Sequence, residues 1–430
     1  GVRAGAGHPP GGDSMNFLQT FNFAITTLSP VHVGCGEDYE PTNYVLDGNR
    51  LYTFDPVLLL RELSTKDREE FARIVERQDS LRGIQRFFYN HKKEAIRVGR
   101  LSANVAESVQ DCYDTSIGQV AQREQGGKNV LNKLEIARTA FNPINGRPIL
   151  PGSSIKGAIR TALCDELLCG KRFPVRTMDA GGIPLREGAI RREASRQNML
   201  MAQEVLGLSA DSKLRFPTDP FRFLKISDGI FRYKIIQKRK DGSAQQVERR
   251  PRVCLQVNRK KRPNKFTAKG NVNTLLECIP ANTAQAFVAQ WVVERKAGPG
   301  ALVPGLQLDF ATVAHACNSF YLQRFNKENG GLKETKYAAD WVAGMEKMLG
   351  NGGFLKTLID EGRGFLLRIG RHSGAESVTV NAPRSIKIMK GQGQSSEYGV
   401  GATTLWLAAD RKDQVDGMQP FGWTFIMRAL

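Results

Sequence analysis

The segment over residues 151–160 carries side chains suited to holding a phosphate group. After a Pro-Gly turn, a serine pair precedes a lysine and an arginine. Serine is a frequent helix N-cap, so we expect a helix to begin at Ser153 or Ser154, with Ile155 and Ile159 on its buried stripe. The first N–H groups of a helix attract anions, and nearby cations add to that attraction. The candidate phosphate contacts are Ser153, Ser154, Lys156, Gly157 and Arg160. The alternative is an ordinary capped helix with solvated basic residues.

His32 lies in a glycine-rich loop after the expected first strand and is the candidate for acid–base chemistry. A histidine titrates near neutral pH, which suits a general acid or base in RNA cleavage. No second histidine or paired lysine lies near it in the sequence, so an RNA contact or a structural role is the other interpretation. We predict RNA binding without catalysis, and cleavage by His32 is the alternative.

A second glycine-containing loop, residues 368–374, carries polar and basic side chains that suit contacts to phosphate or to a 2′-OH group. Its candidate contacts are Arg368, Arg371, His372 and Ser373.

The most basic stretch spans residues 232–269, with fourteen lysines and arginines but only two acidic residues. Two clusters look like turns at strand ends, on either side of an expected strand at residues 253–257, so we expect one basic hairpin. Such a hairpin can neutralise several phosphates. The alternative is a solvated run of charges that contacts no ligand. Tyr233 and Phe266 could stack on bases, although core packing is the commoner use of an aromatic ring. The candidate contacts are Lys238, Arg239, Lys240, Arg259, Lys260, Lys261 and Arg262.

The charge of the whole chain points to a polyanionic partner. It has 62 basic against 43 acidic residues and a net charge of +19. Nucleic acid is the favoured partner, and an anionic membrane surface is the weaker one because no basic amphipathic helix stands out. We expect no membrane span and a cytoplasmic location. Residues 1–14 are interpreted as a tag remnant before a native start at Met15.

The seven cysteines are widely spaced and form no Cys-x-x-Cys pair. Acidic residues that could bind a catalytic metal are scattered along the chain. We therefore predict no disulfide, no metal and no cofactor.

Three sets of motifs resemble the RAMP superfamily, the RNA-binding proteins of CRISPR systems. The segment at residues 151–160 is similar to the glycine-rich segment of that superfamily. The start of the chain is similar to Csm-type RAMP proteins of type III-A effector complexes, and two later segments resemble the family of fifth Csm subunits. These further matches are Leu28-Ser29-Pro30-Val31-His32-Val33-Gly34-Cys35-Gly36, residues 43–46 and 51–55, residues 368–374, and Pro420-Phe421-Gly422-Trp423.

The resemblance implies a non-catalytic subunit that caps the 3′ end of the guide RNA (crRNA). It further implies docking on neighbouring Csm backbone subunits, contact with target RNA, and an influence on guide trimming by recruited host nucleases. RAMP relatives that cut CRISPR repeats use a loop histidine, which is the basis of the endoribonuclease alternative. A third possibility is a protein that binds nucleic acid without regard to a guide.

The elements that position these residues suggest an α+β fold. Alternation predicts a strand over residues 17–27, and an Asp-Gly turn predicts a hairpin over residues 43–54. Residues 97–138 have no clear period and are expected to be a loop, with an RNA-contacting finger as the functional alternative. The apolar pattern after Pro280 predicts a helix with one core-facing stripe. Sheet and helix alternate twice, which predicts two domains, 15–215 and 216–430, and the resemblance implies that each is a ferredoxin-like, RRM-type lobe with helical and loop insertions.

Overall fold

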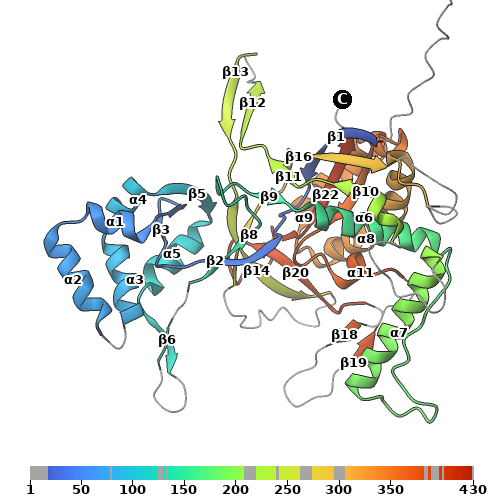
Figure 1. Ribbon diagram of the computed structural model, residues 1–430, viewed down its shortest axis with the longest axis horizontal. Coiled ribbons are helices and arrows are strands. Elements are labelled where there is room, and N and C mark those ends of the chain that lie inside the picture. Colours follow the sequence, from blue (N-terminus) through green and yellow to red (C-terminus); the bar gives the residue numbers. More distant parts are fainter. Residues whose placement is uncertain are drawn as a thin grey trace, which may run out of the picture.

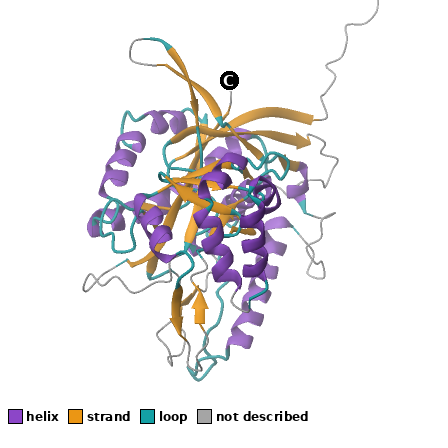
Figure 2. Cartoon of the chain, turned by 90° about the vertical axis from the view of Figure 1, so that its left-hand side faces the viewer, coloured by secondary structure: helices purple, strands orange, loops and turns teal. Residues whose placement is uncertain are grey.

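The chain has a mixed α/β fold built around two large β-sheets (Figure 1). Figure 2 shows strands running through the centre of the molecule, with helices around them. The expected tag remnant at residues 1–14 and the expected boundary between residues 215 and 216 lie outside the described residues. Within the described part of the chain, no helix is long and apolar enough to cross a membrane. The computed structural model describes residues 18–77, 80–123, 129–131, 134–207, 219–238, 242–261, 274–294, 306–381, 386–388, 397–399 and 401–428.

The first sheet has seven strands in the order β17-β22-β1-β16-β11-β9, with β10 also paired to β16. Their bounds are β1 Leu18–Thr27, β9 Ile149–Leu150, β10 Leu224–Ile226, β11 Gly229–Phe231, β16 Thr283–Glu294, β17 Gly364–Arg368 and β22 Trp423–Arg428. The expected first strand is confirmed as β1, which pairs antiparallel with β16 on one edge and with β22 on the other. Its Phe23 and Ile25 are fully buried. The sheet therefore joins the beginning of the chain to its end.

The helix expected after Pro280 is wrong, because this segment forms strand β16. Phe287, Ala289, Trp291 and Val293 are buried, and the residues between them are more exposed. Phe287 and Trp291 are four residues apart, a spacing that places them on one face in a helix and in a strand alike. Pairing with the distant strand β1 decides in favour of the strand.

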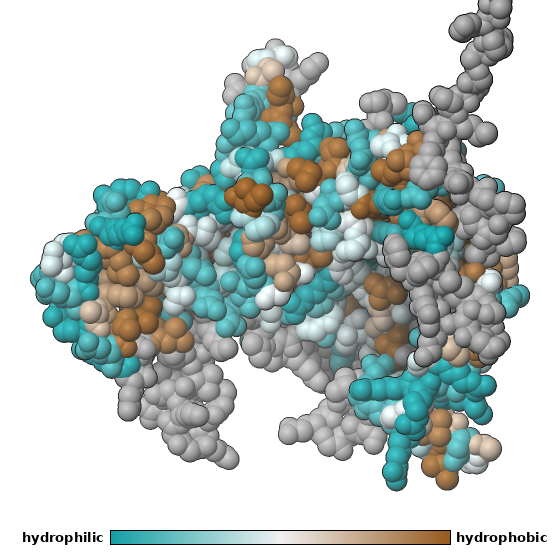
Figure 3. All heavy atoms as spheres, viewed as in Figure 1, coloured by the Kyte–Doolittle hydropathy of each residue, from teal (hydrophilic) through white to brown (hydrophobic). Residues whose placement is uncertain are grey.

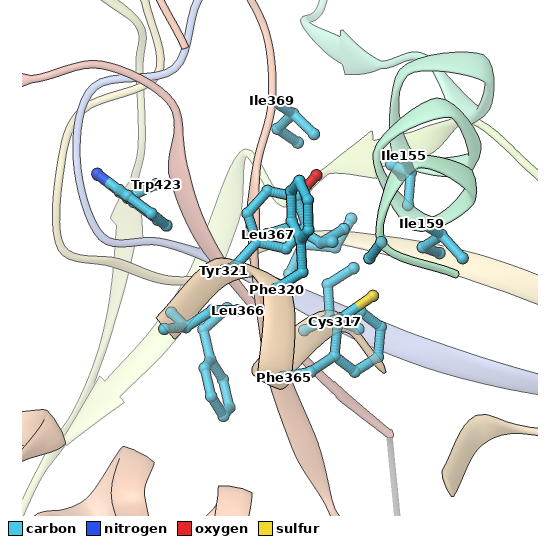
Figure 4. Packing of buried hydrophobic residues seen from close by; sticks show 14 of the residues in the cluster. Ile155, Ile159, Cys317, Phe320, Tyr321, Phe365, Leu366, Leu367, Ile369 and Trp423 are labelled. Atoms are coloured by element: carbon cyan, nitrogen blue, oxygen red, sulfur yellow. The ribbon is translucent and has the colours of Figure 1, made fainter. Parts of the chain in front are cut away.

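Helices α6 and α8 pack together against the first sheet (Figure 4). The stripe predicted for α6 is confirmed, since Ile155 and Ile159 are fully buried. The hydroxyl of Tyr321 in α8 donates a 3.1 Å hydrogen bond to the carbonyl oxygen of Ala158 in α6. The helices of this half are α6 Gly152–Leu167, α7 Glu187–Leu206, α8 Phe310–Thr335, α9 Ala339–Leu349, α10 Phe354–Asp360 and α11 Ala375–Val378, with a short 3₁₀ helix at Pro220–Phe223.

The second sheet has nine strands in the order β2-β8-β15-β14-β5-β4-β3, with β20 and β21 attached through β14. They are β2 Gly34–Tyr39, β3 Tyr44–Asp47, β4 Arg50–Thr53, β5 Arg100–Val105, β8 Ile136–Thr139, β14 Arg252–Lys260, β15 Leu275–Cys278, β20 Thr404–Ala409 and β21 Gln419–Pro420. The predicted β3–β4 hairpin is confirmed, and its turn residues Gly48 and Asn49 have φ of 56° and 59°. Both large sheets contain strands from either side of residue 215.

A helical cluster lies at one end of the molecule, where α1 to α4 pack near strands β3 and β4 (Figure 1). The helices are α1 Pro56–Glu62, α2 Thr65–Val75, α3 Ser80–Asn90, α4 Lys92–Val98 and α5 Glu107–Ser116. The loop expected over residues 97–138 is wrong for most of its length, because the segment contains β5, α5, β8 and a hairpin of β6 Val120–Arg123 with β7 Asn129–Leu131. The alternation of buried Ala103 and Val105 is a strand signal in this segment. The tip of the β6–β7 hairpin, residues 124–128, lies outside the described residues.

Two further hairpins form separate two-stranded sheets. They are β12 Lys234–Lys238 with β13 Ala244–Glu248, and β18 Ile386–Ile388 with β19 Glu397–Gly399. The β12–β13 hairpin rises from the body of the molecule in Figure 1.

Candidate nucleic-acid interface

Helix α6 begins at Gly152, and its first N–H group is capped from another part of the chain. The expected serine N-cap is wrong, because Pro151 occupies the N-cap position and no side chain there makes a capping bond. The Gly152 N–H instead donates to Oδ1 of Asp228 at 2.8 Å. A Cβ atom on Gly152 would lie 2.2 Å from the carbonyl oxygen of Ile226, so only glycine fits this approach. The contact fixes the start of α6 against the loop that follows β10.

The basic side chains of α6 have different environments. Arg160 forms a 2.7 Å ion pair with Asp219, and its guanidinium lies 4.5 Å from the ring centroid of Phe221. Lys156 is half-buried and has no ion pair or hydrogen bond to another described residue. Burial lowers the pKa of Lys156, although the nearby Asp219 carboxylate opposes this shift. The charge of Arg160 is therefore partly neutralised, whereas Lys156 forms no ion pair with any residue that the structure describes.

The remaining α6 candidates lie around Lys156. Ser153 and Gly157 are exposed and Ser154 is half-buried. A Cβ atom on Gly157 would meet nothing within 4 Å, which shows open space beside the helix. The structure thus brings this set together on one accessible side of the first turns of α6.

The two glycine-containing loops, distant in sequence, are in contact. The Arg371 N–H donates a 2.8 Å hydrogen bond to the carbonyl oxygen of His32. Gly370 has φ of 87°, and a Cβ atom there would lie 2.4 Å from the same oxygen. The left-handed backbone and the close approach both require glycine at this position.

His32 is fully buried within this contact. Its Nδ1 lies 2.8 Å from the carbonyl oxygen of Glu277, and its Nε2 is buried without a hydrogen-bond partner among the described residues. Burial is the main cause that lowers the pKa of His32. A side chain without exposed surface does not reach an RNA phosphate in this arrangement, so its position argues for a structural role.

Sequence reasoning missed a buried carboxylate beside this histidine. Glu277 accepts hydrogen bonds from the Tyr39 hydroxyl at 2.9 Å and from the Thr139 N–H at 3.1 Å. Burial raises its pKa to about 7. The available signal was a single carboxylate inside the apolar run of β15.

The second loop is anchored by a buried ion pair. Arg368 lies 2.7 Å from Glu328, and the two side chains are only 8% and 7% exposed. Arg368 also donates to the carbonyl oxygen of Phe421 at 2.9 Å, and Glu328 accepts from the Trp423 indole N–H at 2.8 Å. The Arg368 guanidinium is therefore enclosed by the protein.

The other candidates of this loop differ in exposure. Ser373 is buried and donates to the carbonyl oxygen of Gly370 at 2.7 Å. His372 stacks on Trp406 with ring centroids 4.8 Å apart and hydrogen-bonds Gln256. Burial lowers the pKa of His372 to about 4. Arg371 is exposed, and its side chain has no ion pair to another described residue, so it is the accessible cation of the loop.

The single basic hairpin expected over residues 238–262 is wrong, because two separate features occupy it. The β12–β13 hairpin ends at Glu248, and β14 then enters the nine-stranded sheet, where it pairs with β15, β20 and β5. Residues 253–257 are buried there, which explains why this strand cannot project.

The basic candidates of this stretch divide accordingly. Arg259 is buried and donates to the carbonyl oxygens of Lys412 and Gln414. Lys260 is exposed, and Lys261 forms a 3.0 Å ion pair with Glu376. Arg239, Lys240, Arg262 and the aromatic Phe266 lie outside the described residues, as does the side chain of Lys238.

No group of three or more His, Cys, Asp or Glu side chains able to hold a metal occurs among the residues described by the structure. The Sγ atoms of Cys254 and Cys278, on neighbouring strands, lie 3.4 Å apart as free thiols.

Comparison with protein families gives a match to the RAMP superfamily over residues 24–291. Among curated proteins, the chain is 28% identical over 159 residues to the CRISPR system Cms protein Csm5 of Mycobacterium tuberculosis strain H37Rv, covering 35% of this chain and 40% of that protein. It is 30% identical over 152 residues to the Csm5 protein of Streptococcus thermophilus, covering 34% of this chain and 39% of that protein. The matched segments thus span about 40% of the length of these relatives.

Two solved structures share the fold over nearly the whole chain. One is a chain of the Csm–crRNA–target RNA ternary complex of a type III-A CRISPR-Cas system, with a TM-score of 0.55, 17% identity and coverage of 95% of this chain and 100% of that one. The other is Csm5 of T. onnurineus, with a TM-score of 0.50, 16% identity and coverage of 93% and 99%. At this level of identity, the likeness concerns the fold.

Proposed function

This chain belongs to the RAMP superfamily and is Csm5-like, and we propose that it is a type III-A effector subunit that holds the 3′ end of the guide RNA without cutting it. Names of the curated relatives, the fold shared with a Csm–crRNA–target RNA complex and the net charge of +19 all support this proposal. We also propose that the fold comprises two ferredoxin-like, RRM-type lobes with helical and loop insertions.

The observation that carries the proposal is the environment of Lys156. This cation lies in the second turn of α6, beside exposed Ser153 and open space at Gly157. It has no ion pair with another described residue, so its charge is available to an anion. We assign phosphate contacts of the guide to Ser153, Ser154, Lys156, Gly157 and Arg160.

A second group of contacts is proposed around the loop of residues 368–374. Arg371 would reach the RNA directly because it is exposed. Arg368, His372 and Ser373 would hold the loop in shape through their internal hydrogen bonds. Buried His32 would support the loop through the hydrogen bond that its carbonyl oxygen accepts from the Arg371 N–H.

The basic residues between 238 and 262 form the third group. Lys260 is exposed at the end of β14. Lys238, Arg239, Lys240, Lys261 and Arg262 complete this proposed set, and Arg259 supports it from its buried position. Each phosphate neutralised in this way would steepen the salt dependence of binding.

In the proposed mechanism, base pairing by the guide selects the target RNA, and the protein holds backbone and shape. This division explains why cations, rather than base-specific pockets, dominate the candidate surface. We further propose neighbouring Csm backbone subunits as docking partners, host nucleases as partners in guide trimming, and the cytoplasm as the location.

The absence of RNA cleavage is part of the proposal. A general acid or base must come within hydrogen-bond reach of the proton it transfers. His32 is fully buried, so it does not meet this requirement in the described conformation.

The test uses the purified chain with end-labelled single-stranded RNA in EDTA, followed by native and denaturing gels. We expect a shifted, intact RNA and weaker binding to duplex DNA. Discrete cleavage that disappears in His32→Ala would support the endoribonuclease instead. Equal affinity for duplex DNA would support a protein that binds nucleic acid without regard to a guide.

A further inference from the structure

A pocket of about 270 Å³ opens where the β12–β13 hairpin joins the body of the protein. Its walls come from the start of β5, the loop of residues 142–148, Tyr233 before β12 and Arg250 after β13. Three arginines and no acidic side chain appear among the described residues that line it. We call it the Tyr233 pocket.

The aromatic ring in its lining, that of Tyr233, lies against two cations. The guanidinium groups of Arg147 and Arg250 lie 4.9 Å and 5.0 Å from the Tyr233 ring centroid. The Tyr233 hydroxyl donates to Glu248 at 3.0 Å, and Arg250 forms an ion pair with the same carboxylate at 2.5 Å. Glu248 belongs to β13, so the hairpin itself fixes the orientation of the ring.

The arginines retain donors for a ligand. Arg147 is exposed, and no hydrogen bond or ion pair to another described residue occupies its guanidinium. Arg100 is exposed and donates one hydrogen bond, at 2.7 Å, to the carbonyl oxygen of Asn145. A guanidinium has five N–H donors, so most of those on Arg100 remain available.

Arg100 also occupies space that a glycine leaves open. Gly146 has φ of 61°, and a Cβ atom there would lie 2.1 Å from the Arg100 guanidinium. The backbone of the loop thus supports the Arg100 side chain at the rim of the pocket.

We propose that the Tyr233 pocket binds one nucleotide of single-stranded RNA. Arg100 and Arg147 would contact the phosphate of this nucleotide, and its base would stack on the Tyr233 ring and the Arg250 guanidinium. Guanidinium groups pair with phosphate oxygens in a bidentate geometry. Unpaired bases stack on aromatic rings and on guanidinium planes. The carboxylates of an acidic peptide would pair with the arginines but would not stack on the Tyr233 ring. The presence of both arginines and an aromatic ring therefore favours a nucleotide.

The position of the pocket suits an RNA strand that also contacts α6. The loop of residues 142–148 is followed directly by β9 and then by the start of α6. The space-filling view in Figure 3 shows the projecting hairpin with both hydrophilic and hydrophobic side chains on this face. The inference rests on the proposed function, to which it adds a site outside the three groups of contacts named above.

The experiment measures the dissociation constant of the full chain for a fluorescein-labelled single-stranded RNA at several salt concentrations. Arg147→Gln should weaken binding several-fold and reduce the slope of log K against log salt by about 0.7, the value for one lost phosphate contact on a single strand. Tyr233→Leu should weaken binding about fivefold or more, the lower range for one lost base stack. Tyr233→Phe keeps the ring but loses the hydrogen bond to Glu248, so it should bind more tightly than Tyr233→Leu.

Arg363→Gln is the matched control, since this exposed arginine lies elsewhere and pairs with Glu361. If the slope of log K against log salt fell equally for Arg147→Gln and Arg363→Gln, the effect would come from the net charge of the protein, and the proposed pocket would be wrong. Unchanged binding in Arg147→Gln and Tyr233→Leu would overturn the pocket and leave the proposed function standing. Absence of RNA binding by the unaltered chain would instead contradict the proposed function, and the pocket with it. Because the Arg147 side chain is exposed, its variant tests the pocket even if Tyr233→Leu unfolds.

Discussion

The carbonyl oxygen of His32 accepts a 2.8 Å hydrogen bond from the backbone N–H of Arg371. These residues lie near opposite ends of the chain, in the two glycine-containing loops that the sequence marks as candidates. The bond joins the two loops, in which the Arg371 side chain is exposed and the His32 side chain is fully buried. One loop therefore presents a cation while the other supports it.

Gly370→Ala tests this contact. The added Cβ atom would meet the His32 oxygen at 2.4 Å, and the left-handed φ disfavours alanine. We expect the free energy of unfolding to fall by about 1–3 kcal/mol, detected as a lower midpoint of thermal unfolding. Gly330→Ala is the control, because it lies within α8 with open space around it and should be neutral or stabilising. Equal midpoints for the two variants would contradict the close approach.

Arg368→Met tests the buried ion pair. Removing the arginine leaves Glu328 buried and without its cation, so we expect a loss of about 3–5 kcal/mol in the free energy of unfolding. The exposed pair of Arg363 and Glu361 provides the control, and Arg363→Met should cost at most about 1 kcal/mol. A stable Arg368→Met variant with reduced RNA affinity would show that Arg368 contacts RNA rather than anchoring the loop.

Glu277→Gln should change how stability depends on pH. Burial raises the pKa of Glu277 from 4.5 to about 7, against the opposing effects of Tyr39, Arg138, the Thr139 N–H and Arg100. Between these values the folded protein holds a proton that the unfolded chain has released, so this group makes stability fall as the pH rises.

Glutamine removes that titration, and its amide can still pair with Tyr39 and Thr139. The unfolding midpoint of Glu277→Gln relative to the unaltered chain should therefore increase from about pH 5 to about pH 8, by an amount worth up to about 3 kcal/mol. A difference that stays constant or decreases with pH would contradict a raised pKa at Glu277.

Several elements were predictable because their signals are local. The Asp-Gly turn of the β3–β4 hairpin and the four-residue repeat of Ile155 and Ile159 in α6 depend on neighbours in the sequence. Strand β16 was not predictable from the sequence, because the spacing of Phe287 and Trp291 fits a helix and a strand equally. Only the pairing with β1 distinguishes the strand from the helix.

The candidate interface shows the same division. Lys156 and Arg371 were identified from motifs, and both retain available charge in the structure. The burial of Arg368 and the cap that Asp228 provides to α6 depend on partners distant in sequence. No local pattern marks Glu328 as the partner of Arg368, so sequence reasoning placed a buried arginine among the RNA contacts.

Lys156→Gln tests the phosphate site on α6. Loss of one contact should weaken single-stranded RNA binding and reduce the slope of log K against log salt by about 0.7. The control is Lys356→Gln, which also removes one positive charge but lies on α10 in an ion pair with Asp360. Identical salt dependence in the two variants would contradict a phosphate contact at Lys156.

The most direct test of the central claim is nuclease protection of the guide RNA in effector complexes assembled with and without this chain. We expect the 3′ end of the guide to be protected only when the chain is present, and Lys156→Gln to weaken this protection. Protection of the 3′ end that does not depend on the chain, or protection gained only at the 5′ end, would contradict this expectation.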